Sequence, residues 1–338
     1  YKNMGQTSNK GVELQLDAIV VDAKDFGLNF NFNISYNRGK IDKLNGSSFW
    51  QSSSWAGTAA AGIEDFLVEE GGRLGEVYGY KTDGFYTAND FTFDAEKGTY
   101  ALKEGVNDCS SLIGGKVYPG SIKLKANEDG EYKKERLGNT VPTVSGGFGL
   151  NARWKGFDFT AFFNYSLGNK IVNATKLGSS FYSGSSKNWN INDHFTSASR
   201  YSWIDSSTGT NLLSSASIKA NGEAWTINRL NEINSNASIW NPAAATVMPL
   251  VDWAVEDGSF LRVNNITIGY TLPKLLVNKL NIQNIRIYVT GYNLHCFTKY
   301  SGTDPEVDCC TSTPMTPGID YAAYPKSRSF VGGINVTF

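Results

Sequence analysis

Apolar and polar residues alternate strictly over residues 25–38, and this pattern predicts a β-strand. The apolar positions are Phe26, Leu28, Phe30, Phe32, Ile34 and Tyr36. Asparagine recurs between them, at Asn29, Asn31 and Asn33. Successive side chains of a strand point to opposite faces, and a long unbroken alternation with asparagine on one face is typical of a barrel strand between lipid and a wet lumen. We therefore expect Asn29, Asn31 and Asn33 to face the lumen.

The same alternation returns over residues 157–167. One face is apolar and mostly aromatic, with Phe157, Phe159, Ala161, Phe163, Tyr165 and Leu167. The other face carries Asp158, Thr160, Asn164 and Ser166, and we expect Asp158 and Asn164 to face the lumen. Phe162 interrupts this polar face. The lumen at that point is therefore predicted to hold something apolar, or to use the ring for stacking on a ligand.

Further strands are predicted at residues 11–22, 144–154, 259–272, 285–294 and 329–338. The faces of the first strand become ambiguous at Ile19 and Val21. Strand parity permits either no extra barrel strand or two extra strands within residues 39–142, where the aromatic segments 77–86 and 119–127 are the candidates. Each of these segments also suits a hairpin inside a loop. We predict an arc of roughly nine to eleven tilted antiparallel strands, each of about ten residues.

The connections between these strands are of two kinds. Short turns are predicted at residues 22–25, 154–156 and 273–284, and long excursions at residues 39–142 and 169–250. In outer-membrane barrels the short turns are periplasmic and the long loops extracellular. The excursion at residues 169–250 is expected to have its own fold and a function, because structureless loops of that length are uncommon in compact domains.

Composition agrees with a large β protein. Of 338 residues, 41% are hydrophobic and 13% aromatic, and 35 are glycine. The formal net charge of -1 provides no basic surface for nucleic acid, so nucleic-acid binding is not expected. No apolar run approaches the roughly 18 to 20 residues of a transmembrane helix, so residence in a membrane requires a closed barrel. Residues 1–10 are polar and lack the apolar core of a signal peptide, and we interpret the chain as part of a longer protein.

Several blocks of the sequence resemble, in order, successive blocks of the SusC/RagA family of TonB-dependent transporters from Bacteroidetes. The blocks are NKGVELQLDAIVVDAKDFGLNFNFNISYNRGKI, RLGEVYGYKTDGFY, PGSIKLKANEDG, the LGN…P run before SGGFGLNARWKGFDFTAFFNYSLGNKI, EDGSFLRVNNITIGYTLP, RIYVTGYNL, TKYSGTDPEV and YPKSRSFVGGINVTF. The resemblance implies an all-β fold in which residues 1–338 form the C-terminal part of a transmembrane antiparallel β-barrel of roughly 22 strands with long extracellular loops. The plug domain and the earlier barrel strands are absent from this chain.

The resemblance also implies a function. It points to energised import of a nutrient oligomer across the outer membrane, most simply an oligosaccharide and otherwise a peptide, with the C-terminus on the periplasmic side. The implied partners are a SusD-like surface lipoprotein, the TonB complex acting through the missing plug, the cargo and the lipid bilayer. A passive porin and an outer-membrane barrel hydrolase are the alternatives from other functional classes.

Tryptophans in the excursions are the candidates for contact with cargo or with the lipoprotein, because indole faces stack on sugars. They are Trp50, Trp55, Trp189, Trp203, Trp225 and Trp240. Packing within the loops, or a place in an interfacial aromatic girdle, is the alternative for each of them. Phe338 ends an alternating strand and resembles the C-terminal signal that the outer-membrane assembly machinery recognises. The alternative is that it only anchors the strand at the interface.

The sequence offers little chemistry for catalysis, metal binding or a cofactor, and none is expected. Asp193 and His194 are neighbours without a serine-nucleophile motif, and Asp304 with Glu306 is interpreted as structural rather than as a glycosidase pair. Where related sequences have an acidic loop that resembles a calcium site, Ala126 removes one oxygen ligand, so residues 127–130 are predicted to be a tight turn.

The cysteines leave two alternatives open. Cys109, Cys296, Cys309 and Cys310 either form disulfides after export or remain free thiols in loops. A zinc site is disfavoured, because neither His194 nor His295 lies at ligand spacing from a cysteine pair.

Overall fold

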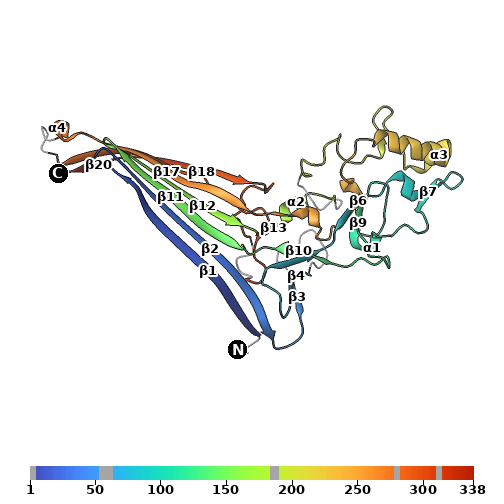
Figure 1. The fold of residues 1–338 in the computed structure, drawn as a ribbon. Coiled ribbons are helices and arrows are strands. Elements are labelled where there is room, and N and C mark those ends of the chain that lie inside the picture. The colour runs from blue at the N-terminus through green and yellow to red at the C-terminus, as the bar shows by residue number, and fades with distance from the viewer. Residues whose placement is uncertain (1–4, 53–63, 183–189, 278–281, 310–313) are drawn as a thin grey trace.

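A long curved sheet forms one end of the molecule, and a separate loop domain extends beyond it (Figure 1). The structure is a computed structural model that describes residues 5–52, 64–182, 190–277, 282–309 and 314–338. The main sheet has seven antiparallel strands in the spatial order β1, β2, β11, β12, β17, β18, β20. Their bounds are β1 Gly5–Asp22, β2 Phe26–Leu44, β11 Val144–Trp154, β12 Phe157–Leu167, β17 Phe260–Thr271, β18 Asn284–Thr298 and β20 Ser329–Thr337.

The predicted strands are confirmed, but the predicted number of nine to eleven is wrong. Within the described residues, no strand of the first excursion joins the main sheet. The segment at residues 77–86 contributes to β5 and β6, and β6 pairs with β9 from the segment at 119–127. The two segments therefore form a two-stranded sheet within the loop domain, and neither is a hairpin by itself, because β7, β8 and α1 lie between β6 and β9. In addition, β2 continues to Leu44, so the first excursion begins later than residue 39.

The registers of the main sheet account for the ambiguous face at the end of the first strand. Ile19 lies opposite Asn29 while Val21 lies opposite Leu28, so a β-bulge falls between them. A bulge shifts the alternation by one residue, which moves the following side chain to the other face. Another bulge interrupts β17, where Phe162 and Phe163 lie opposite Asn265 and Val263.

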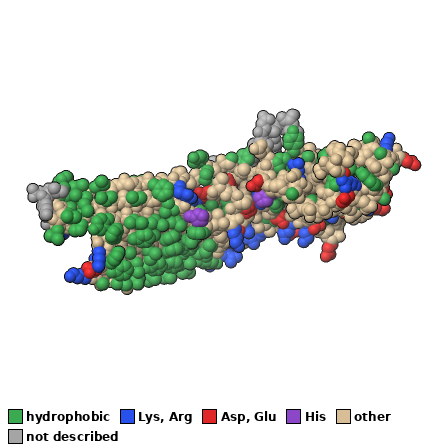
Figure 2. All heavy atoms as spheres, turned by 90° about the horizontal axis from the view of Figure 1, so that it is seen from above, with side chains coloured by type: hydrophobic (Ala, Val, Ile, Leu, Met, Phe, Trp, Pro, Cys, Tyr) green, Lys and Arg blue, Asp and Glu red, His purple; other side chains and the backbone are tan. Residues whose placement is uncertain are grey.

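One face of the main sheet is apolar and remains exposed over its whole width (Figure 2). Val12 is 71% exposed, Ile268 is 55% exposed and Phe330 is 70% exposed, although a soluble sheet would cover such residues. We call this the outer face and the opposite, asparagine-bearing face the inner face. Phe338, just beyond the end of β20, is 81% exposed and follows the outer-face residues Ile334 and Val336.

The short turns meet at one end of the sheet. Lys155 N donates to Asp25 O (3.1 Å), and Thr271 N donates to Gly156 O (2.8 Å). Helix α4 (Lys274–Val277) and the C-terminus lie at this same end, far from the loop domain (Figure 1). The segregation of short turns from long excursions is therefore confirmed.

The two long excursions share one hydrophobic core and form the loop domain together with Ile319–Asp320 from the connection between β18 and β20. Tyr86 and Phe66 from the first excursion and Tyr201 and Leu212 from the second are almost fully buried in it. Its strands are β3 Phe49–Ser52, β4 Glu64–Val68, β5 Glu76–Gly79, β6 Thr82–Phe85, β7 Phe91–Asp94, β8 Thr99–Leu102, β9 Ile122–Leu124, β10 Glu135–Asn139, β13 Lys170–Asn173, β14 Ile204–Asp205, β15 Thr210–Asn211, β16 Val255–Asp257 and β19 Ile319–Asp320. Its helices are η2 Ala88–Asp90, α1 Ser110–Ile113, α2 Ala174–Gly178, α3 Ser215–Ile233, η4 Pro242–Ala244 and η5 Asp252–Ala254.

Helix α3 shows how local sequence shapes this domain. The Ser214 side chain caps its start by accepting a hydrogen bond from Ser217 N, and Gly222 interrupts it at φ 76° and ψ 177°. Glycine adopts this conformation without a steric penalty, so the helix changes direction there. No helix among the described residues has the length and hydropathy needed to cross a membrane.

Candidate functional site

The inner face of the main sheet carries a continuous row of polar side chains. Asn29 lies opposite Asn151, which lies opposite Thr160, and the row continues through Thr267 and Thr290. Thr160 Oγ1 donates to Asn151 Oδ1 (3.1 Å), and the hydroxyl groups of Thr267 and Thr290 are 2.8 Å apart. The registers place Asn31, Asn33, Asp158 and Asn164 on this same face. The structure therefore brings the five predicted lumen residues to one face, and the lumen itself stays a prediction.

Asp158 is part of a fixed ion pair near the short-turn end of the inner face. Arg286 Nε donates to Asp158 Oδ1 at 2.9 Å, and Arg286 Nη2 donates to Oδ2 at 2.5 Å. Gly269 makes room for the pair, because a Cβ atom there would lie 2.5 Å from the Asp158 carboxylate. A carboxylate held by both guanidinium nitrogens has a defined orientation, which makes this part of the wall stiff.

Phe162 has a structural explanation that the sequence pattern did not provide. Its neighbours on β11 are Gly147 and Gly149, and a Cβ atom on Gly147 would lie 3.1 Å from the Phe162 ring. The ring therefore covers backbone that has no side chain of its own, which stabilises adjacent glycine-rich strands. The ring also borders a hollow of about 570 Å³ on the inner face, between Asn33 and Asn164 on the sheet and Glu306 on the opposite side.

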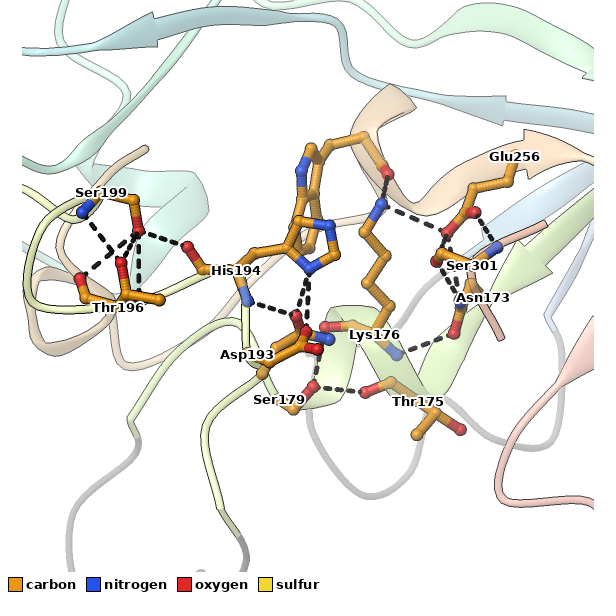
Figure 3. Close-up of polar contacts among 12 residues, drawn as sticks. Asn173, Thr175, Lys176, Ser179, Asp193, His194, Thr196, Ser199, Glu256 and Ser301 are labelled. Atoms are coloured by element: carbon orange, nitrogen blue, oxygen red, sulfur yellow. Dashed lines mark hydrogen bonds and ion pairs between the residues drawn. The ribbon is translucent and has the colours of Figure 1, made fainter. Parts of the chain in front are cut away.

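A buried polar cluster lies at the base of the loop domain, around the side chains of Lys176 and Glu256 (Figure 3). Lys176 Nζ, from α2, lies 3.2 Å from Glu256 Oε1, donates to Trp253 O (2.9 Å) and lies 4.1 Å from the Trp253 ring centroid. Glu256 also accepts hydrogen bonds from Ser301 N (2.8 Å), Ser301 Oγ (2.7 Å) and Asn173 Nδ2 (3.1 Å). The Glu256 carboxylate therefore ties the connection between β12 and β17 to the connection between β18 and β20 at the base of the loop domain.

Electrostatics favour the charged form of this carboxylate. Burial raises the pKa of Glu256, but the hydrogen bonds from Ser301 and the ammonium of Lys176 outweigh burial and hold the pKa below its usual value. Asp320 behaves differently, because burial raises its pKa while the Tyr300 hydroxyl donates to it at 2.6 Å. The same region therefore stabilises the charged form of Glu256 and disfavours the charged form of Asp320.

The neighbouring acid and base at residues 193 and 194 do touch, but they contact groups that offer no nucleophile. His194 Nδ1 lies 3.2 Å from Asp193 Oδ1 and 2.5 Å from Asn192 Oδ1, and its ring meets Trp253 edge to face (Figure 3). Ser199 Oγ donates to the main-chain oxygen of His194 rather than to the imidazole. Among the residues that the structure describes, no serine hydroxyl makes the contact with the His194 imidazole that a catalytic serine requires.

The acidic pair at residues 304 and 306 has the structural role that we predicted. Both carboxylates bind Arg262 of β17, with Nη2 to Asp304 Oδ1 and Nε to Glu306 Oε2 at 2.5 Å each. Sequence reasoning missed Arg262, although its phase on the strand and its charge were visible. Its partners lie more than forty residues further along the chain, and no local pattern connects them.

Two of the four cysteines are not in disulfides. Cys109 and Cys296 are free thiols, so a complete set of disulfides among the four cysteines is wrong. Burial raises the pKa of the Cys109 thiol. Cys310 lies outside the described residues.

The loop at residues 127–130 is the segment that the sequence analysis compared with a calcium site. Residues 127–130 form the predicted tight turn, with Asn127 Oδ1 accepting from Asp129 N and Glu131 N. Within the part of the chain that the structure describes, no three His, Cys, Asp or Glu side chains are grouped to hold a metal ion.

The predicted tryptophans differ in their surroundings. Trp240 is 4% exposed, donates from Nε1 to Ser180 O (3.1 Å) and meets Trp253 edge to face, which favours packing over ligand contact. Trp203 is half-buried and donates to Pro119 O. Trp225 on α3 and Trp50 on β3 are 43% and 37% exposed. Trp55 and Trp189 lie outside the described residues.

Curated proteins with sequence similarity to this chain cover it over its whole length. No family model matches it. TonB-dependent receptor P3 of Formosa agariphila is 28% identical over 347 residues, which covers 100% of this chain and 29% of the receptor. TonB-dependent receptor SusC of Bacteroides thetaiotaomicron is 23% identical over 344 residues, covering 100% of this chain and 27% of SusC.

Solved structures with a similar fold also cover the whole chain. A structure of the RagAB peptide importer in its "closed-closed" state matches with a TM-score of 0.64 and 23% identity, covering 100% of this chain and 30% of that one. The chain thus spans less than a third of the curated relatives that it matches. These relatives are receptors and transporters rather than enzymes. Over its whole length this chain is therefore similar in sequence to a segment of TonB-dependent receptors, SusC among them, and its antiparallel sheet and loops are similar in fold to a segment of the RagAB structure.

Proposed function

We propose that this chain forms the C-terminal part of the barrel wall and the outer loops of a TonB-dependent importer of nutrient oligomers. The observation that carries the proposal is the two-faced main sheet, apolar and exposed on one side and asparagine-rich on the other, within a chain that is similar to TonB-dependent receptors from end to end. A wall of this kind separates lipid from a polar path. The C-terminus, with the short turns, then lies on the periplasmic side, and the loop domain lies outside the cell.

The cargo that the proposal favours is an oligosaccharide. Amide side chains on the inner face offer both hydrogen-bond donors and acceptors, and the indoles of Trp225 and Trp50 are partly exposed on the loop domain. A peptide is the alternative, since the fold resembles that of a peptide importer. A SusD-like lipoprotein would cover the loop domain, and TonB would act through parts of the protein that this chain does not contain.

Uptake measurements test the proposal. Cells that depend on this protein are given fluorescent oligosaccharides or fluorescent peptides of matched size, with and without an uncoupler of the proton gradient. Energy-dependent uptake of the oligosaccharides alone supports the proposed cargo, and uptake of the peptides alone replaces it by the peptide alternative. Passage of both without energy would identify a passive porin, and release of shortened products outside the cell would identify a hydrolase.

A further inference from the structure

The segment of residues 300–309, which we call the inner strap, lies on the inner face of the main sheet. Pro305, Glu306 and Val307 of the strap border the hollow of about 570 Å³ whose other wall contains Asn33, Phe162 and Asn164 on the sheet. The strap thus faces residues of β2 and β12, although the chain enters it from β18. A connection that merely linked β18 to β20 would have no need to cover strands in the middle of the sheet.

A buried ion cluster attaches the strap to the sheet. The Arg262 side chain is only 5% exposed, and the Asp304 and Glu306 side chains that bind it are 4% and 22% exposed. Lys326, on the returning limb of the same connection, adds a second cation 2.9 Å from Glu306 Oε2. Removing one partner from a buried ion pair leaves an unpaired buried charge, which is strongly destabilising.

The strap is also held in shape by its own hydrogen bonds. Asp304 accepts from Glu306 N (3.0 Å) with one carboxylate oxygen and from Lys326 N (3.2 Å) with the other. Cys309 N donates to Ile319 O (2.8 Å). Both limbs of the connection therefore converge on the carboxylates that Arg262 binds, while Ser301 at the start of the strap is bound separately to Glu256.

We propose that Arg262 is a positioning residue of the import path: it holds the inner strap against the inner face and thereby sets the width of the path at that level. This inference rests on the proposed function, because the inner face borders a path only in a transporter. Arg262 itself acts through the strap and needs no contact with the cargo.

The chain contains a natural probe for the position of the strap. Cys296 is a free thiol that lies opposite Arg262 in the register of β17 and β18. It interacts electrostatically with Arg262, Asp304, Glu306 and Lys326, which places it beside the ion cluster. Cys296 is partly exposed with the strap in place, and release of the strap should expose it further. Cys109 is fully buried in the loop domain and should react only if that domain unfolds.

The experiment measures the rate of maleimide labelling of Cys296 and Cys109 by peptide mass spectrometry in the full-length protein. Arg262→Met is expected to raise the rate at Cys296 about ten-fold or more and to leave Cys109 protected, because local opening exposes only the released part. The matched control is Arg286→Met, which breaks the ion pair with Asp158 on the same face without touching the strap. Its Cys296 rate should equal that of the wild type.

A variant that removes all three charges separates attachment from general destabilisation. Arg262→Met combined with Asp304→Asn and Glu306→Gln leaves only the Lys326 ammonium unpaired, and that side chain is 47% exposed to solvent. Cys296 should remain reactive in this variant because the attachment is still missing. A labelling rate of Cys296 equal to that of the wild type in either variant would overturn the proposal. Joint exposure of Cys296 and Cys109 in Arg262→Met would also overturn it, since the cluster would then stabilise the whole fold.

Permeability measurements test whether the position of the strap sets the width of the path. Cells with Arg262→Met should admit a hydrophilic solute too large for porins faster than cells with Arg286→Met. A reactive Cys296 without any change in permeability or uptake would show that the strap does not border the path. If the labelling pattern is as expected but the wild-type protein imports neither class of oligomer, the proposed function fails while the attachment of the strap by Arg262 stands.

Discussion

The Lys176 ammonium and the Glu256 carboxylate form an ion pair at 3.2 Å inside the base of the loop domain, with 9% and 13% of their side chains exposed. Lys176→Met should lower the stability of the loop domain by about 3 kcal/mol, because it leaves the Glu256 carboxylate buried without its cation. Hydrogen exchange of the amides in α2 and β16 measures the loss. Lys97→Met is the matched control, since Lys97 pairs with Asp94 while 78% exposed, and a cost below about 1 kcal/mol is expected there. Equal effects of the two variants would show that the buried pair has no special role.

The same carboxylate predicts a pH dependence. The pKa of Glu256 is lowered in the folded state, so its contribution to stability is present above the ordinary pKa of a glutamate and is lost as the pH falls through the folded value. Glu256→Gln should therefore be less stable than the wild type at pH 7, and the difference should shrink in acid. Protection of the loop domain against protease, measured from neutral to acidic pH, checks this. A difference that is constant with pH would contradict the assignment.

Trp225 and Trp240 should respond differently to the same substitution. Trp240→Ala is expected to cost about 3 to 5 kcal/mol of loop-domain stability, because the indole fills the core against Trp253 and Phe195. Trp225→Ala should leave stability nearly unchanged and weaken uptake or lipoprotein binding, since its ring is 43% exposed. Hydrogen exchange and uptake assays on both variants separate the effects. Normal uptake and normal lipoprotein binding in Trp225→Ala would exclude that residue as a contact.

Three exposed lysines test the orientation across the membrane. Lys24 lies in the turn between β1 and β2, Lys274 begins α4, and Lys219 lies on α3 of the loop domain. Each is changed to Cys, and intact cells are treated with a maleimide that does not cross the outer membrane. Lys219→Cys should be labelled at once, and the other two only after permeabilisation. Labelling of Lys24→Cys or Lys274→Cys in intact cells would reverse the proposed orientation.

Phe338 allows an assembly signal to be distinguished from an interfacial anchor. The ring is 81% exposed and follows the outer-face residues of β20, and its burial in lipid is worth about 1 to 3 kcal/mol. If the ring is recognised before folding, Phe338→Ala should reduce the amount of assembled protein far more than it lowers the Tm of the molecules that do assemble. Quantitative blotting of membranes and thermal melting measure the two effects. Normal amounts of assembled protein with a lowered Tm would show that Phe338 is an interfacial anchor and not an assembly signal.

The sequence by itself determined the strands of the main sheet and their two faces. The alternation around Phe30 and Asn31 has a period of two residues, which is a local property of the backbone, so the side of each residue follows without knowledge of its neighbours. The ambiguity at Ile19 and Val21 likewise marked a real β-bulge. The separation of short turns from long excursions also follows from position along the chain.

The tertiary structure decided what depends on contacts between distant segments. The aromatic segments of the first excursion had the composition of barrel strands, but they are buried against Tyr201 and Leu250 of the second excursion. Trp240 and Trp225 look alike in sequence, and only packing separates the buried ring from the exposed one. Arg262 acquired its role because a segment about forty residues later folds back onto the inner face. Ion pairs and core contacts of this kind form across space, so no pattern along the chain contains them.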